Sequence, residues 1–295
     1  MKKISIIIAT KNQASQLKEC VDAALEQGYP KKDFEVIVMD DGSTDKAPEI
    51  IKKYGKKIKI VWNESAGRVL GLNKSIKMAR FPFVCVSAGD IIFEKNFLKT
   101  IMSYFKSPEI GFVSPFHETG GNATVYSKKA IEEAGYFDPE FNEKGTGFRD
   151  DTDLVFRIWD KGYKSIFTYD AARFRHEHKT PSSISGKIMY AWARIKIHRF
   201  DALLFKKHPE RAKEFFDVKL GFIRNPWKDF AAATGLWWKG TKSKDFALSS
   251  PQGVKLIEGK SFLHVIAIIV LGIVYVLLVK GARLYGSIKY GTLLL

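Results

Sequence analysis

The sequence has few cysteines, few prolines and no low-complexity tract, and these absences narrow the class of protein. Of 295 residues, 2 are cysteine and 10 are proline. A disulfide-stapled scaffold, a collagen-like chain and a disordered chain are therefore excluded. Cys20 and Cys85 lie in apolar patterns without CxxC spacing. We interpret them as small buried hydrophobic residues of a protein from a reducing compartment.

Acidic residues are scarce in the second half of the chain. Residues 1–179 carry 29 basic and 25 acidic side chains, whereas residues 180–295 carry 19 basic and 7 acidic ones. The formal net charge of +16 therefore comes mostly from the second half. Such an excess indicates an anionic partner, either a nucleic acid or an acidic membrane surface.

One long uncharged run, FLHVIAIIVLGIVYVLLV, covers residues 262–279. As a helix it would be about 27 Å long, close to the hydrocarbon thickness of a bilayer. We therefore predict a transmembrane helix over 261–280 and a short tail over 281–295, with a buried core helix or a shallow re-entrant segment as alternatives. Basic residues flank the run on both sides, so its orientation stays open. The apolar run that opens the chain is too short for a signal peptide, which predicts a single-pass membrane protein with its bulk in the cytosol.

Short apolar runs alternate with helical patterns through residues 1–180. The predicted strands cover 4–10, 34–40, 58–62 and 83–86, and the predicted helices cover 14–27, 48–54, 70–79 and 95–104. This alternation predicts an α/β fold with βαβ units and a mixed, mostly parallel sheet flanked by helices. Ligands of such sheets bind beyond the carboxyl ends of the strands. We therefore expect the site in the loops Thr10–Asn12, Asp40–Ser43 and Ser87–Asp90.

Acidic residues stand at two of these strand ends. Asp40 and Asp41 end the second strand, where a carboxylate can accept the ring N–H of a nucleotide base; an ordinary Asx turn is the alternative. Asp90 follows the fourth strand, where a divalent cation bridging two phosphates needs an oxygen ligand; capping of a following helix is the alternative.

A third acidic group, Asp150, Asp151 and Asp153, opens the helical pattern DDTDLVFRIWDKGY. Three acids in one turn repel one another unless a cation or the helix N-terminus stabilises them. Capping accounts for one or two, which leaves a candidate general base. His176 and His178 follow on an extended segment whose side chains alternate, so at most one of them is expected to reach a metal or phosphate; exposed loop histidines are the alternative.

Taken in order, these segments resemble a family 2 glycosyltransferase of the GT-A fold over about residues 3–180. ISIIIATKNQASQLKECVDAALEQ is similar to the first strand, loop and helix of that family, and EVIVMDDGSTD to its nucleotide-binding signature. GNATVYSKKAIEEAGYFDPEF resembles the acceptor-side segment, and FRDDTDLVFRIWDKGY the motif that supplies the base. The resemblance implies transfer of a sugar from a nucleotide diphosphate to an acceptor hydroxyl or phosphate, usually with inversion and with Mg²⁺ or Mn²⁺.

The same resemblance assigns roles to residues of this chain. Asp151 matches the base, beside Asp150, and Asp90 matches the metal-binding strand end. The donor-binding positions that it implies are Ala9, Lys11, Val38, Asp40, Asp41, Arg68 and Asn73. The family usually shows Asp-x-Asp where this chain has Ser87-Ala88-Gly89-Asp90, so metal binding is expected to be weaker, completed by the diphosphate, water or His176, and metal independence stays open.

Residues 181–260 are rich in Lys, Phe and Trp, including Trp227, Trp237 and Trp238. Basic side chains beside tryptophans are typical of an interfacial extension, which would set the active site beside a bilayer and favour a lipid-linked glycan or polyprenyl phosphate as acceptor. A packed helical extension with a solvated basic rim is the alternative. A nucleotidyltransferase and a non-catalytic nucleotide-sugar-binding partner are further alternatives; no nucleic-acid-binding motif is present.

Overall fold

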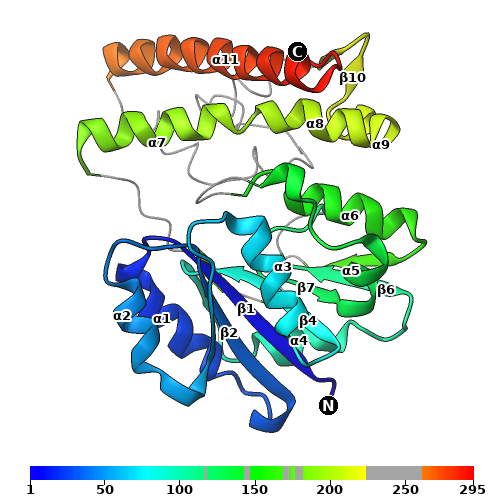
Figure 1. Ribbon diagram of the computed structural model, residues 1–295. Coiled ribbons are helices and arrows are strands. Elements are labelled where there is room, and N and C mark those ends of the chain that lie inside the picture. The colour runs from blue at the N-terminus through cyan, green and yellow to red at the C-terminus, as the bar shows by residue number, and fades with distance from the viewer. Residues whose placement is uncertain (116–117, 143–146, 169–171, 173, 177–181, 224–260) are drawn as a thin grey trace. The chain divides into compact units, whose positions relative to one another are not determined.

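The computed structural model describes residues 1–295 apart from 116–117, 143–146, 169–171, 173, 177–181 and 224–260 (Figure 1). The chain forms two compact units, Met1–Lys179 and Thr180–Leu295. The first unit ends one residue from the boundary that the sequence predicts for a catalytic domain.

The first unit contains a seven-stranded sheet. Its strands are β1 (Ile4–Thr10), β2 (Phe34–Asp40), β3 (Lys59–Trp62), β4 (Phe83–Ala88), β6 (Ile110–Ser114), β7 (Thr124–Ser127) and β8 (Lys164–Phe167). They are ordered β3-β2-β1-β4-β7-β6-β8. Strands β1 to β4 are parallel, β7 is antiparallel to both neighbours, and β6 is parallel to β8. The predicted mixed, mostly parallel sheet flanked by helices is confirmed.

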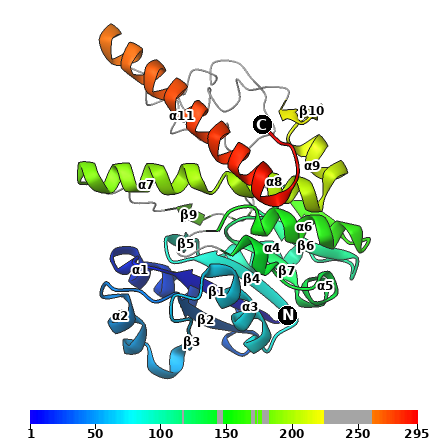
Figure 2. The same ribbon diagram turned by 45° about the horizontal axis from the view of Figure 1, so that its top comes forward.

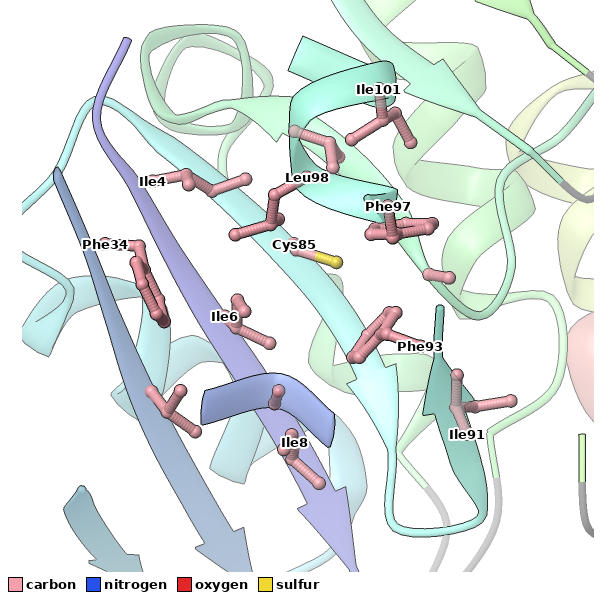
Figure 3. Packing of buried hydrophobic residues seen from close by; sticks show 14 of the residues in the cluster. Ile4, Ile6, Ile8, Phe34, Cys85, Ile91, Phe93, Phe97, Leu98 and Ile101 are labelled. Atoms are coloured by element: carbon pink, nitrogen blue, oxygen red, sulfur yellow. The ribbon is translucent and has the colours of Figure 1, made fainter. Parts of the chain in front are cut away.

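Helices cover both faces of this sheet. They are α1 (Ala14–Leu25), α2 (Ala47–Lys53), α3 (Arg68–Met78), α4 (Phe97–Ser103), α5 (Lys128–Ala134) and α6 (Asp150–Asp160). Ile4, Ile6 and Ile8 of β1 point into the core formed with α1, α2 and α4, as Figure 3 shows for part of it. Ile7 and Ala9 point into the opposite core, formed with α3, α5 and α6. Because both faces are covered, β1 is apolar at nearly every position.

The register of the central strands brings their carboxyl ends to one edge. Thr10 of β1 lies opposite Asp40 of β2, and Ala9 lies opposite Ala88 of β4. The three strands run in the same direction in Figure 3. The loops that follow them therefore leave the sheet side by side, as the sequence predicts.

A small second sheet lies beyond β4. Strand β5 (Ile91–Phe93) pairs antiparallel with β9 (Phe174–His176), with Ile91 opposite His176. The alternative in which Asp90 caps a helix is therefore wrong, because the residues after it form a strand. The pairing instead brings His176 beside Asp90.

The second unit consists mainly of helices. Its elements are α7 (Ile184–Lys196), α8 (Arg199–Lys207), α9 (Pro209–Phe215), β10 (Val218–Lys219), β11 (Phe222–Ile223) and α11 (Phe262–Tyr290). Helix α11 has 29 residues and continues past the predicted boundary at residue 280. Among the described residues it is the one helix long and apolar enough to cross a membrane. Trp227, Trp237 and Trp238 lie outside the described residues.

Replacing Phe112 tests the packing of the α3–α5–α6 face. This ring is fully buried, and its centroid lies 5.8 Å from that of Tyr126 and 6.0 Å from that of Trp159. We expect Phe112→Ala to lower the free energy of unfolding of the first unit by about 3–5 kcal/mol, because it leaves a cavity. Phe112→Leu should cost clearly less. Urea denaturation followed by far-UV circular dichroism measures both, and equal losses would contradict this packing.

Candidate functional site

The loops after β1 and β2 are joined by hydrogen bonds of their polar residues. The backbone N–H of Asn12 donates to Ser43 Oγ (2.9 Å), and the N–H of Thr44 donates to Asn12 Oδ1 (2.8 Å). Asp40, buried at the end of β2, accepts the N–H of Ser43 through Oδ1 (2.8 Å). The Asx turn is thus present, and a role of Asp40 in recognising a base stays a prediction.

Asp41 organises the neighbouring loop after β3. Its Oδ1 accepts bonds from Asn63 Nδ2 (2.7 Å) and from the N–H of Gly67 (2.9 Å). Lys11 Nζ lies 3.4 Å from Asp41 Oδ2 and donates to the Asp41 carbonyl (2.8 Å). Asp41 is 2% exposed, so its carboxylate binds the loops after β1 and β3 rather than solvent. It fixes the point where α3 begins.

The start of α3 is tied to the start of α6. Gly67, with φ of 106°, precedes Arg68, the first residue of α3. The Arg68 guanidinium forms an ion pair with the carboxylate of Asp150, the first residue of α6. This contact joins residues 82 positions apart and brings α6 to the edge where β1, β2 and β3 end.

The three acids of α6 have different surroundings. Asp150 is buried against Arg68, and Asp153 is buried in an ion pair with Arg157 (2.5 Å). Asp151 is only partly buried, and its Oδ1 accepts the N–H of Thr152 (2.8 Å). Arginine guanidinium groups thus pair with two of the three acids. Asp151 has no ion-pair partner among the described residues.

Asp151 lies against the segment between β6 and β7. A side chain at Gly120, where φ is +91°, would come within 2.7 Å of the Tyr126 hydroxyl and 3.5 Å of Asp151 Cβ. Tyr126 belongs to the segment that the sequence places on the acceptor side. The partly exposed carboxylate and the predicted acceptor segment therefore adjoin.

Asp90 and His176 form a second potential binding pair. Asp90 is buried after β4, and its Oδ2 lies 3.3 Å from His176 Nε2. A carboxylate oxygen suits Mg²⁺ or Mn²⁺ and an imidazole nitrogen suits a transition metal, with further ligands from phosphate and water. Within the described residues no group of three or more His, Cys, Asp or Glu side chains is arranged to hold a metal. His178 lies outside the described residues.

The remaining predicted donor residues are placed differently. Ala9 is buried in the α3–α5–α6 core, and Val38 is fully buried in the opposite core. Asn73 donates through Nδ2 to the Phe137 carbonyl (2.8 Å) and accepts the Phe137 N–H through Oδ1 (3.0 Å). These contacts anchor α3, and the predicted contacts of the three residues with a donor stay predictions.

The sequence analysis does not identify two asparagines of the site, Asn63 and Asn142. Asn63 follows β3, so the rule that polar residues after parallel strands meet at one edge would have found it. Asn142 accepts the N–H of Val69 through Oδ1 (3.1 Å) and donates to the Ala66 carbonyl (2.7 Å). Nothing in the sequence near Asn142 indicates that it stabilises a helix start more than 70 residues away.

Comparison with known proteins agrees with this geometry. Residues 5–162, more than half of the chain, match the family "Glycosyl transferase family 2". The chain belongs to glycosyl transferase family 2. The match spans all strands and helices from β1 to α6 that form the edge described above.

Curated relatives are similar over parts of their length. A "dolichyl N-acetyl-alpha-D-glucosaminyl phosphate 3-beta-D-2,3-diacetamido-2,3-dideoxy-beta-D-glucuronosyltransferase" of Methanococcus voltae is 36% identical over 104 residues, 34% of this chain and 32% of the relative. The poly(ribitol-phosphate) beta-N-acetylglucosaminyltransferase TarS of Staphylococcus aureus is 32% identical over 108 residues, 35% of this chain and 19% of TarS. The matches thus cover a third or less of these two relatives.

Solved structures share the fold at low sequence identity. The mannosyltransferase PcManGT of Pyrobaculum calidifontis, in complex with GDP-Man and Mn²⁺, aligns with a TM-score of 0.65 and 18% identity over 96% of this chain and 87% of that one. A structure of S. aureus TarS residues 1–349 aligns with a TM-score of 0.52 and 16% identity over 98% and 92% of the two chains. Both alignments confirm the GT-A-like fold.

The burial of Asp150 predicts a specific dependence of stability on pH. Burial raises the pKa of the Asp150 carboxyl from 3.8 to about 6, with Arg68 opposing the rise and Asp151 adding to it. The folded state therefore holds this proton more tightly than the unfolded chain does. The resulting stabilisation is present in full below pH of about 4 and is lost as the pH rises through about 6.

We therefore expect the Tm advantage of the native chain over Asp150→Asn to shrink between pH 4 and pH 7, because the asparagine does not titrate. Differential scanning fluorimetry at several pH values measures this difference. Asp160→Asn, which changes an exposed carboxylate of the same helix, is the matched control. An advantage that stays constant or grows with pH would contradict the assignment.

Proposed function

We propose that this protein transfers a sugar from a nucleotide-diphosphate donor to an acceptor at the edge where β1, β2, β3 and β4 end. One observation carries the proposal. The contacts Asp41–Gly67 and Arg68–Asp150 bring the acidic start of α6 to the loops after the first three strands. Membership of a glycosyltransferase family supports it, as do solved neighbours with GDP-Man, UDP or UDP-GlcNAc bound.

The reaction requires a base on the acceptor side. A hydroxyl is a poor nucleophile, and it attacks the anomeric carbon more readily when a carboxylate accepts its proton as the bond forms. Asp151 suits this role because it is partly exposed, has no ion-pair partner among the described residues and adjoins the segment around Gly120. Asp150, held by Arg68, orients the helix start. Attack opposite the departing diphosphate gives inversion.

The diphosphate side requires positive charge. Asp90 and His176 would hold Mg²⁺ or Mn²⁺ together with diphosphate oxygens and water. Such a cation would neutralise the charge that develops on the leaving diphosphate. The structure of PcManGT with Mn²⁺ supports metal use. Lys11, whose Nζ donates to the Asp41 carbonyl, would contact the donor from the loop after β1.

The acceptor is proposed to be lipid-linked. The M. voltae relative is named for a dolichyl-phosphate-linked sugar acceptor. Helix α11 is long and apolar enough to enter a membrane, and residues 180–295 carry 19 basic and 7 acidic side chains. A catalytic unit held at a cytosolic membrane surface would meet an acceptor whose lipid stays in the bilayer. The sequence predicts a single-pass anchor, with a re-entrant segment as its alternative.

Asp151→Asn tests the base. We expect transfer to fall roughly 10²- to 10⁴-fold with donor affinity nearly unchanged, because the amide cannot accept the proton but leaves the loops after β1 and β2 intact. Product formation with a lipid extract as acceptor and calorimetric titration of the donor measure the two quantities. Asp160→Asn, at the far end of α6, should transfer at the native rate. Parallel loss of transfer and donor affinity in Asp151→Asn would mark this residue as structural.

Asp90→Asn tests the metal pair. We expect Mn²⁺ to tighten donor binding to the native chain, and this gain to fall at least about tenfold in Asp90→Asn, because the variant loses an anionic oxygen ligand. His176→Gln should reduce the gain by a smaller factor. Donor titrations with and without Mn²⁺ measure it, and Glu94→Gln, an exposed change four residues away, is the control. An unchanged metal response in Asp90→Asn would count against the pair.

A further inference from the structure

The last third of α11 is held against α8 by a buried charge cluster. Arg283 is 3% exposed, and its Nε donates to Asp201 Oδ2 of α8 (2.9 Å). The same carboxylate oxygen lies 3.0 Å from His198 Nδ1. Separating a buried ion pair leaves an uncompensated charge and is strongly unfavourable. Figures 1 and 2 both show this end of α11 lying against α8.

Close packing and the end of the chain strengthen this contact. A Cβ at Gly286 would clash with the Arg199 carbonyl oxygen, so the two helices approach closely there. The N–H of Ile223 donates to the Leu295 carbonyl (3.1 Å), and the N–H of Leu295 donates to the Gly221 carbonyl (3.0 Å). Leu295, at the C-terminus, therefore lies beside β11, and the neighbouring Leu294 is tied to α11 because its N–H donates to Ser287 Oγ (3.0 Å).

The first two thirds of α11 expose large apolar side chains. Leu263 is 76% exposed, Leu271 66% and Leu277 64%, and residues 262–279 contain no charged side chain. So large an apolar surface does not remain in water. Its length, its lack of charge and the basic surplus of residues 180–295 fit a bilayer with anionic lipids.

A helix that crossed the bilayer would place Ser261 on the opposite side from Ile223. Residues 224–260 would then have to cross the bilayer as well. A crossing needs about 20 predominantly apolar residues. The longest uncharged stretches in 224–260 are 230–238 and 246–254, with nine residues each. The sequence of this segment therefore argues against a crossing.

We propose that α11 enters one leaflet of the membrane without crossing it, so that its two ends lie on the same face. This proposal rests on the membrane association proposed above. A helix about 10 Å across fits in one leaflet, whose hydrocarbon is about 15 Å thick. The segment 177–198 carries Lys179, Lys187, Arg194 and Lys196, so it does not cross either. The catalytic unit, Ser261 and the C-terminus then share one side, in place of the predicted single-pass arrangement.

Three single-cysteine variants test this arrangement in the full chain. Ser261→Cys reports the first end of α11, Lys289→Cys its last turn, and Lys18→Cys the catalytic unit; all three positions are exposed. Cys20 and Cys85 are fully buried, so the native chain is the unlabelled control. Sealed membrane vesicles are treated with a membrane-impermeant maleimide before and after permeabilisation, and labelling is measured by gel shift.

The proposal predicts the same sidedness for all three variants. Labelling of Ser261→Cys from the side opposite to Lys289→Cys would overturn it, as would no labelling of Ser261→Cys after permeabilisation. A chain that stays in solution when the vesicles are sedimented, for example as a dimer that covers α11, would overturn it too. Donor hydrolysis by the same preparations shows separately whether the transferase function holds.

Discussion

The ion pair between Arg68 and Asp150 is the contact on which the candidate site depends. It joins the first residue of α3 to the first residue of α6, 82 positions later. Asp41 positions α3 by accepting the N–H of Gly67. A continuous series of contacts therefore connects the loop after β2 with the acids of α6. These contacts bring Asp151, the proposed base, to the edge where the loops after β1 and β2 lie.

The acidic residues of the site differ in burial and in their partners. Asp41, Asp150 and Asp153 are buried and each has a cationic or amide partner, so they hold chain segments together. Asp151 is partly exposed and has no ion-pair partner among the described residues. A carboxylate that is to accept a proton from a substrate needs such access. The neighbours of Asp151 therefore stabilise the helix start, and Asp151 is the one that we propose as the base.

The sequence predicts local structure and the edge of the site well, but not its long-range pairings. Strands β1 and β2 are found at their exact ends, because continuous apolar runs followed by turn residues are a local signal. The pairing of Ile91 with His176 and the ion pair of Arg68 with Asp150 depend on tertiary contacts that no local pattern encodes. The Asp153–Arg157 pair, by contrast, has helical i,i+4 spacing, which a local pattern does encode.

A double-mutant cycle on Arg68 and Asp150 tests the central claim most directly. The values of kcat/KM for Arg68→Met, Asp150→Asn and the double variant give the coupling energy between the two side chains. If the pair acts as one unit that places Asp151, the double variant loses little more than the worse single variant, with a coupling of at least about 1 kcal/mol. Additive losses would show that the two residues act independently, and would contradict the account.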